Sequence, residues 1–330
     1  MWRQTTAVPE VAVITGASSG IGRAAALEFS RRGVAVVIAA RRAVALERLV
    51  EECEQSGAPA LAVATDVSDE ESVNQLREAA LAKFGHFNVW VNNAAVTHYA
   101  RFAESTGPMD RRVIETNLLG YLYGARAALS HFHQRGAGVL INNGSILGRI
   151  GQPYNTAYVA SKFGILGLSK SLRQELVGTR IRVCDVLPGA TDTPLFRHGA
   201  NHTGRAVKPM TPIDSADRVA RAIVDLSFRP RREVIIGWGP KLGSWLTRFC
   251  PGLMERLVAR EVRRRQFANA PAPRTSGNLV RPMSETDTVS GGWIASDTLG
   301  DSRPSKLEAR STKSETNSKH EGPKVQNQRV

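Results

Sequence analysis

The sequence predicts an α/β protein with a doubly wound parallel sheet, that is, a Rossmann-type fold. Short runs of β-branched residues alternate with longer helical patterns, the runs are apolar throughout, and a glycine-rich turn follows the first run. Continuous apolar strands joined by amphipathic helices indicate a parallel sheet that is covered on both faces. We therefore expect one dinucleotide-binding type of domain over residues 8–240.

The expected elements follow one another along the chain. Strands are expected at 11–15, 34–40, 60–65, 88–92, 139–143, 182–187 and 234–236. Helices are expected at 20–32, 43–56 and 68–84, and two longer helices at about 110–133 and 157–177. The first two helices each end at a glycine, Gly33 and Gly57, which is typical of a helix C-terminus.

Two segments follow this domain. Residues 241–266 carry Leu242, Trp245, Phe249, Leu253 and Leu257 at near-helical spacing, with arginines between them. Such a basic amphipathic segment either packs on the domain or a partner subunit, or lies on an anionic membrane surface. Residues 267–330 are rich in Ser, Thr, Pro, Gly, Lys and Glu, and we expect a disordered tail because so few apolar residues cannot offset the ordering entropy.

Composition narrows the function classes. The formal charge of +14 attracts polyanions. No helix-turn-helix, zinc-finger or RNP pattern accompanies it, so we do not expect nucleic acid as a partner. Three scattered cysteines predict neither a disulfide framework nor a metal site and favour a reducing compartment. The N-terminus lacks the apolar core of a signal peptide, and the longest apolar run is too short to span a bilayer, so a cytoplasmic protein is expected.

The glycine-rich stretch "TGASSGIG" (15–22) matches two motifs. In one, Gly16 to Gly20 would be the G-x-S-x-G elbow of an α/β hydrolase with Ser18 as nucleophile. That elbow needs an oxyanion-hole loop from an earlier strand, whereas this one follows the first strand, and no histidine stands in a triad context. We therefore reject the hydrolase interpretation.

The other motif is a phosphate cradle. Gly16 permits a tight turn after the strand, while Gly20 and Gly22 let the backbone approach a pyrophosphate. The following helix directs free N–H groups and its positive dipole end at the phosphate. Ser18 and Ser19 then act as hydroxyl and backbone donors.

The end of the second strand bears on the choice of cofactor. An acid there would bind the free 2′-hydroxyl of NAD, but the sequence reads "VVIAARRAV", with Arg41 and Arg42 at that place. A guanidinium can hold the 2′-phosphate of NADP by charge-assisted hydrogen bonds. We therefore expect NADP rather than NAD; the alternative is a solvated basic helix start.

A catalytic set is expected near the carboxyl end of the sheet. "AYVASKFG" places Tyr158 and Lys162 one helical turn apart on one face, and Ser145 follows the apolar strand "VLINN". A free tyrosine has a pKa of about 10, and lowering it by three would require about 4 kcal/mol. An adjacent ammonium supplies part of this, and Ser145 could position a substrate oxygen.

Taken together, these motifs resemble the short-chain dehydrogenase/reductase family over about residues 8–240. The resemblance adds Asp66 in "TDVSD" as the adenine-contacting acid, the central-strand motif "NNAAV" (92–96) and Asn117 in "ETNLLG". It also implies "PG…T" at the nicotinamide, here Pro188, Gly189 and Thr193. Ile21, Val67 and Asn93 complete the cofactor contacts that it implies.

The resemblance implies reversible hydride transfer between NAD(P) and an alcohol or ketone. Tyr158 would be the acid and base, Lys162 would lower its pKa and bind the nicotinamide ribose, and Asn117 would hold a water that connects Lys162 to solvent. It also implies a homodimer or homotetramer through the two long helices. These helices carry apolar residues on more than one side that a monomer would leave exposed: Leu118, Leu119, Leu122, Ala127, Phe163, Ile165, Leu166 and Leu168. The rival hypothesis is a non-catalytic cofactor-binding or regulatory protein with the same fold.

The chain departs from the family pattern at three places. Ala95 replaces the last glycine of the usual "NNAG", and Gly144 stands where a second serine is common. The extension beyond about residue 240 exceeds the minimal domain and leaves substrate and location open.

Overall fold

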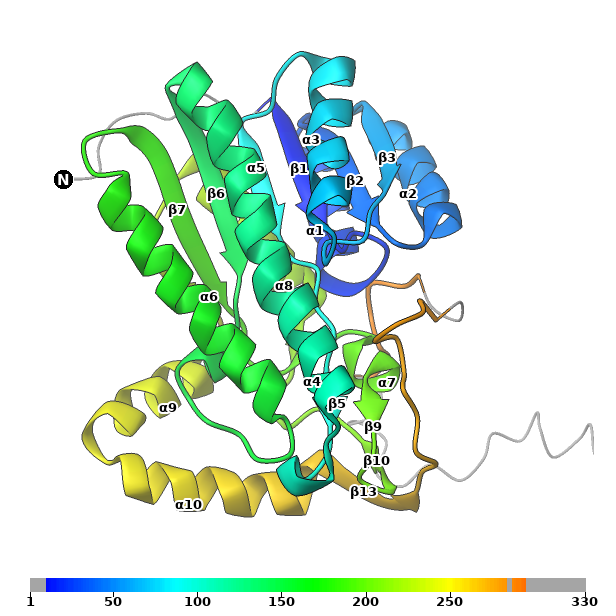
Figure 1. Cartoon of the computed structure of the whole chain (residues 1–330), viewed down its shortest axis with the longest axis vertical. Coiled ribbons are helices and arrows are strands. Elements are labelled where there is room, and N and C mark those ends of the chain that lie inside the picture. The colour runs from blue at the N-terminus through cyan, green and yellow to red at the C-terminus, as the bar shows by residue number, and fades with distance from the viewer. Residues whose placement is uncertain (1–9, 284–286, 295–330) are drawn as a thin grey trace, which may run out of the picture. The chain divides into compact units, whose positions relative to one another are not determined.

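A seven-stranded parallel sheet with helices on both faces forms the centre of the protein (Figure 1). The structure, a computed structural model of the 330-residue chain, describes residues 10–283 and 287–294. The strand order is β12-β7-β6-β4-β1-β2-β3, so the direction of winding reverses between β1 and β4. The predicted doubly wound α/β fold is confirmed. Its strands are β1 (Val11–Thr15), β2 (Ala35–Ala40), β3 (Ala60–Ala64), β4 (Val89–Asn92), β6 (Ala137–Asn143), β7 (Arg180–Leu187) and β12 (Glu233–Ile235).

The apolar runs of the sequence become the two cores of the sheet. Successive side chains of a strand point to opposite faces, so Ile14 and Val13 of β1 belong to different clusters. One face is covered by α1 (Gly20–Arg31), α2 (Ala43–Gln55) and α8 (Ala216–Phe228), and the other by α3 (Glu70–Phe84), α5 (Gly120–Arg135) and α6 (Thr156–Glu175). Every residue of β1, β2 and β4 is buried, which explains why these strands read as continuous apolar runs.

The first of the two predicted long helices is interrupted. The structure divides it into α4 (Gly107–Ile114), a π-helical turn (Glu115–Leu119) and α5. A π-helical turn holds one extra residue per turn and often occurs at a functional site. Here it buries Thr116 and Asn117.

Short elements extend the carboxyl end of the sheet. They pair as β5 (His98–Tyr99) with β9 (Ala200–Asn201), β8 (Thr191–Asp192) with β11 (Asp214–Ser215), and β10 (Arg205–Val207) with β13 (Phe267–Pro271). Helix α7 (Leu195–His198) and 3₁₀ turns at Phe102–Glu104 and Ile146–Gly148 lie among them in the chain.

The predicted extension over 241–266 forms two helices, α9 (Trp238–Phe249) and α10 (Pro251–Glu261), followed by a π-helical turn (Val262–Gln266). Pro251 lacks the N–H that a continuous helix would need, so the chain breaks at Cys250. We call α9 and α10 the hairpin. None of the helices in the described residues is long and apolar enough to cross a membrane.

The structure differs from the predicted disorder over 267–330. Residues 267–271 form β13, and much of the chain from 272 to 293 lies against the domain through hydrogen bonds to residues far away in sequence. Leu279 is buried there. Composition missed this because most of the stabilising contacts use backbone carbonyl and N–H groups, which every residue carries. Residues 284–286 and 295–330 of the predicted tail lie outside the described residues.

Candidate active site

The glycine-rich loop joins β1 to α1 with little space between backbones. Gly16 and Gly20 adopt φ of +66° and +57°, in the left-handed region that favours glycine. A Cβ added to Gly16 would lie 2.6 Å from Cα of Ala94, and one added to Gly22 would lie 2.3 Å from the Gly16 carbonyl oxygen. The loop therefore presents backbone without side chains and the N-terminus of α1 to the cavity, which is the arrangement that an anionic phosphate group fits. One N–H of this terminus, that of Gly20, donates to the Thr288 carbonyl at 2.9 Å.

Ser18 of this loop is engaged by an arginine. Arg42 donates to Ser18 Oγ from Nε at 3.3 Å and from Nη2 at 3.0 Å, and also to the Ser18 carbonyl at 3.1 Å. The contacts tie the loop to the end of β2, and none of them would activate a nucleophile. This supports the rejection of the hydrolase interpretation.

The predicted catalytic residues come from two neighbouring elements. Tyr158 and Lys162 lie on α6, and Ser145 lies two residues after the end of β6. All three are buried, and Ser145 forms a hydrogen bond with Tyr158. Lys162 Nζ donates to the Asn143 carbonyl at 3.0 Å and lies 5.4 Å from the ring centroid of Tyr158.

Burial sets the proton affinities of this pair. It raises the pKa of Tyr158 to about 12, against the lowering effect of the hydrogen bond from Ser145. It lowers the pKa of Lys162 to about 7. The sequence predicts a lowered tyrosine pKa, whereas in the protein by itself desolvation is the larger effect.

Asn117 fixes the chain beyond β4. Its Nδ2 donates to the Val96 carbonyl at 2.9 Å and to Ser161 Oγ at 3.3 Å, while its Oδ1 accepts the Val96 N–H at 2.8 Å. The π-helical turn is what carries this side chain inward. The amide thus joins the central-strand motif to the catalytic helix α6.

Asn93 lies beneath the glycine-rich loop. Its Nδ2 donates to the carbonyls of Thr15 and Gly16, at 2.9 and 3.2 Å, and its Oδ1 accepts from Asn143 Nδ2 at 2.8 Å. It therefore links the loop to the end of β6. Pro188 is tied to the same region, because its carbonyl accepts the Ile146 N–H at 2.9 Å.

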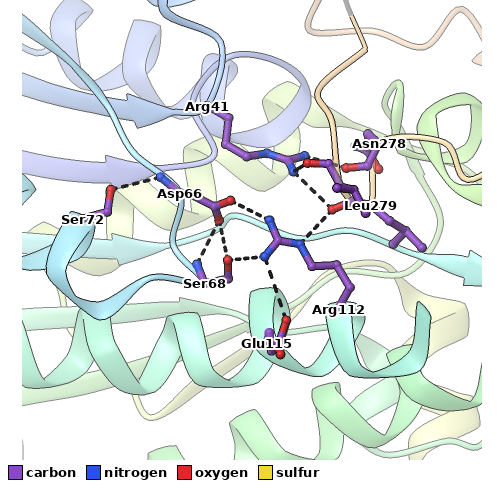
Figure 2. A network of polar contacts seen from close by, with 9 residues as sticks. Arg41, Asp66, Ser68, Ser72, Arg112, Glu115, Asn278 and Leu279 are labelled. Carbon is purple, nitrogen blue, oxygen red and sulfur yellow. Dashed lines mark hydrogen bonds and ion pairs between the residues drawn. The ribbon is translucent and has the colours of Figure 1, made fainter. Parts of the chain in front are cut away.

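A second polar network occupies the end of β3 (Figure 2). Asp66 Oδ1 accepts from the N–H and hydroxyl of Ser68, at 3.0 and 2.7 Å, and Oδ2 pairs with Arg112 Nη2 at 2.6 Å. Burial opposes ionisation of this carboxyl, but the hydrogen bonds from Ser68 and Arg112 outweigh it and lower the pKa of Asp66. Asp66 is therefore an anion held in place at the cavity.

Arg41 meets the C-terminal segment instead of solvent. It donates to the carbonyls of Asn278 at 2.6 Å and of Leu279 and Val280 at 3.2 Å each. Arg42 likewise donates to the Met283 carbonyl at 3.2 Å. The alternative of a solvated helix start does not describe this environment.

A single cavity collects almost the whole predicted site. It is lined by Gly16, Ser18, Ser19, Gly20, Ile21, Arg41, Arg42, Asp66, Val67, Asn93, Ser145, Tyr158, Lys162, Pro188, Gly189 and Thr193. Of the predicted residues, Gly22 and Asn117 are not part of its lining. Asn143 Oδ1 and Thr116 Oγ1 belong to lining residues, are buried, and find no hydrogen-bond partner among the described residues. A bare glycine cradle, a fixed carboxylate and free polar atoms in one cavity fit a dinucleotide. Within the described chain no cluster of His, Cys, Asp or Glu could hold a metal ion.

Two features of the cavity were not predicted from the sequence. Arg112 of α4 bridges Asp66 and the Leu279 carbonyl, and Asn278, Pro282 and Met283 form part of the wall. No sequence pattern marked Arg112 as a site residue, because a single arginine in an amphipathic helix is ordinarily a surface residue. Residues 278–283 stand in a longer stretch rich in Ser, Thr, Pro and Gly, whose composition resembles that of a linker.

Comparison with known proteins gives the same family as the site. A family model for short chain dehydrogenases matches residues 10–203. The oxidoreductase YxnA of Bacillus subtilis is 37% identical over 295 residues, covering 87% of this chain and 83% of its own length. The cis-4-hydroxycyclohexanecarboxylate dehydrogenase of Sinomonas cyclohexanicum is 37% identical over 227 residues, covering 66% and 88%.

A solved structure agrees with the sequence relatives. It is an alcohol dehydrogenase from the archaeon Thermococcus sibiricus, complexed with 5-hydroxy-NADP, with 30% identity and a TM-score of 0.61 over 69% of this chain and 95% of that one. The sequence and the fold both match over most of the domain. The chain belongs to the short-chain dehydrogenase family of oxidoreductases.

Proposed function

We propose that the protein transfers hydride reversibly between NADP and an alcohol or ketone. The observation that carries this proposal is one cavity lined at once by Tyr158, Lys162 and Ser145 and by the glycine-rich loop and Asp66. The first group suits proton transfer to a substrate oxygen, and the second suits a dinucleotide. When bound, the cofactor supplies the hydride in reduction and accepts it in oxidation.

Tyr158 is the proposed acid and base. In ketone reduction its Oη gives a proton to the substrate oxygen, and in alcohol oxidation it takes that proton back. Ser145, already hydrogen-bonded to Tyr158, would hold the same oxygen in place. A charged Lys162 at 5.4 Å would stabilise the phenolate by about 3 kcal/mol at an effective dielectric of 20, which lowers its pKa by about two.

The cofactor preference rests on the guanidinium groups at the ends of β2 and β3. Arg112 forms the ion pair with Asp66, while Arg41 donates to three neutral carbonyls. A phosphate oxygen offers the guanidinium attraction between two full charges in addition to the hydrogen bond, whereas a neutral carbonyl oxygen does not. A 2′-phosphate that replaced those carbonyls would therefore bind Arg41 more strongly than they do, which favours NADP over NAD.

Tyr158→Phe tests the reaction. The change removes the transferable proton and leaves the cofactor cradle alone, so NADPH should bind with an unchanged Kd while turnover falls by about 10²–10⁴-fold. Turnover would be followed by NADPH absorbance with a library of carbonyls and alcohols. A variant that keeps more than a tenth of the wild-type rate contradicts the assignment. A wild type that binds NADPH and turns over no member of the library would favour the non-catalytic alternative.

We also propose that the hairpin lies on an anionic membrane surface. Its apolar side chains are largely in solvent: Trp238 is 75% exposed, Trp245 59% and Phe249 60%. Leu242, Leu253 and Leu257 are exposed as well. Residues 238–266 contain seven Lys or Arg and two Glu. Exposed aromatic residues among excess positive charge suit a surface of acidic lipid headgroups.

The hairpin adjoins the substrate end of the cavity. A Cβ added to Gly189, which lines the cavity, would lie 2.7 Å from Cγ of Pro240 on α9. Gln266, the last residue of the turn after α10, also lines the cavity. An apolar alcohol or ketone dissolved in the membrane would thus meet the site directly.

Vesicles with phosphatidylserine should bind the protein and neutral vesicles should not. Trp245→Glu should abolish vesicle binding. Phe102→Glu changes a similarly exposed aromatic residue outside the hairpin and should leave vesicle binding unchanged. If the wild type does not bind vesicles and instead forms a dimer that Trp245→Glu abolishes, a second copy of the chain covers the hairpin.

A further inference from the structure

The described parts of the segment after β13 lie along the cavity. We call residues 272–283 and 287–293 the strap; in Figure 1 it is the orange chain beside the carboxyl end of the sheet. Asn278, Pro282 and Met283 of the strap line the same cavity as the glycine-rich loop and Tyr158. The strap is therefore a wall of the proposed cofactor site.

The first anchor of the strap lies at the substrate end. Thr275 exchanges backbone hydrogen bonds of 2.9 and 3.0 Å with Asn201, and the Asn278 N–H donates to the His198 carbonyl at 2.9 Å. Leu279 is 1% exposed and belongs to the apolar cluster that contains Tyr158. Leu279 therefore fastens this part of the strap to the interior of the domain, while residues 273–276 remain exposed.

The last anchor lies at the other side of the glycine-rich loop. The N–H of Gly20, at the start of α1, donates to the Thr288 carbonyl at 2.9 Å. Asp192 accepts from Ser290 Oγ at 2.6 Å and from the N–H groups of Gly291 and Trp293 at 3.0 and 2.9 Å. The strap is thus held at both ends of the cavity.

Two arginines hold the strap between these anchors. Arg41 donates to the carbonyls of residues 278–280, and Arg112 Nε donates to the Leu279 carbonyl at 3.0 Å (Figure 2). The same Arg112 guanidinium pairs with Asp66 through Nη2 and contacts Ser68 through Nη1. One planar group therefore connects the adenosine-side carboxylate with the strap.

Only one of these arginines can keep that connection when NADP binds. On the proposed function, a 2′-phosphate takes Arg41 away from its neutral carbonyl partners. Arg112 is already oriented by its ion pair with Asp66 at 2.6 Å. Its Nε therefore keeps its hydrogen bond to the Leu279 carbonyl with either cofactor.

We propose that the strap is a clasp that closes over the bound dinucleotide, and that Arg112 is the positioning residue that latches it. The inference rests on the proposed cofactor site. A dinucleotide enclosed between the glycine-rich loop and the strap leaves only when the clasp opens, so the latch sets the rate of cofactor release.

The test compares Arg112→Met with Arg111→Met, a matched change at the exposed neighbour on α4. Dissociation of NADPH and of NADH would be measured by stopped-flow fluorescence, and hydrogen exchange would be measured on peptides from 272–293 in the protein without cofactor. Arg112→Met should release both cofactors about tenfold faster, equivalent to about 1.4 kcal/mol, and should speed exchange in the strap. Arg111→Met should do neither.

Arg112→Lys separates the latch from a general loss of stability. Lysine restores the charge opposite Asp66 but lacks the planar fork that reaches Leu279 as well. We expect a thermal midpoint close to wild type with cofactor release still fast. The inference is overturned if Arg112→Met releases cofactor and exchanges strap amides at the wild-type rates. If Arg112→Met does not fold, the inference is overturned when Arg112→Lys releases cofactor at the wild-type rate. If wild type binds neither dinucleotide, the proposed function fails, and strap exchange in the cofactor-free variants still decides whether Arg112 is the latch.

Discussion

Lys162→Met should stabilise the fold at neutral pH while it removes a group that the proposed mechanism needs. Lys162 is 2% exposed, and its ammonium has the Asn143 carbonyl at 3.0 Å and the Tyr121 and Tyr158 rings near it. No ion pair to Lys162 is found in residues 10–283 or 287–294. Burial consequently lowers the pKa of Lys162 to about 7, from an ordinary value of 10.5.

The sign of the effect follows from proton binding. The unfolded chain holds the lysine proton up to about pH 10.5, and the folded protein releases it at about 7. Between these values the unfolded state binds more protons, so the free energy of unfolding rises with pH and is lowest below pH 7. The full difference corresponds to about 5 kcal/mol. Methionine has a similar length, carries no charge, and forfeits about 1 kcal/mol of hydrogen bonding.

Urea denaturation of the cofactor-free protein at pH 6, 7, 8 and 9, followed by tryptophan fluorescence, would measure this. Lys162→Met should be more stable than wild type by several kcal/mol at pH 6, and the difference should shrink steadily as the pH rises. Lys170→Met, an exposed position on the same helix, is the control and should follow wild type. Parallel curves for wild type and Lys162→Met from pH 6 to 9 would refute the argument that burial determines this lysine's charge.

Three further outcomes are expected. Gly22→Ala should raise the Kd for NADPH by about tenfold or more, because its Cβ would lie 2.3 Å from the Gly16 carbonyl oxygen; Gly167→Ala, with nothing within 4 Å, should bind normally. Arg41→Asp should lower the NADPH-to-NADH affinity ratio by at least about tenfold, because it removes the guanidinium proposed to hold the 2′-phosphate and places a carboxylate there that repels it; an unchanged ratio counts against NADP preference. Light scattering at micromolar concentration should give a homodimer or homotetramer through the outer side of α5 and α6, where Phe163 is 46% exposed; a monomeric mass contradicts this.

The oligomer prediction is narrower than the sequence suggested. Of the apolar residues expected at that interface, Ala127, Ile165 and Leu166 are buried within the protomer. Leu118, Leu119, Leu122 and Leu168 are partly buried and remain available with Phe163. Helical periodicity shows which residues share a face, but a helix packed on two sides needs the structure to tell its inner face from its outer one.

The sequence by itself determined the sheet, its strands to within two residues, and the proximity of Tyr158 to Lys162. These depend on local properties: continuous apolar runs, glycines at φ of +66° and +57°, and a spacing of one helical turn. The strap and its latch were decided by tertiary structure alone. Arg112 stands 46 residues from Asp66 and 167 from Leu279, and Arg41 stands 237 from Asn278. Their partners on the strap are backbone carbonyls, identical in every residue type, so no pattern of side chains could specify them until folding brought both segments to the same cavity.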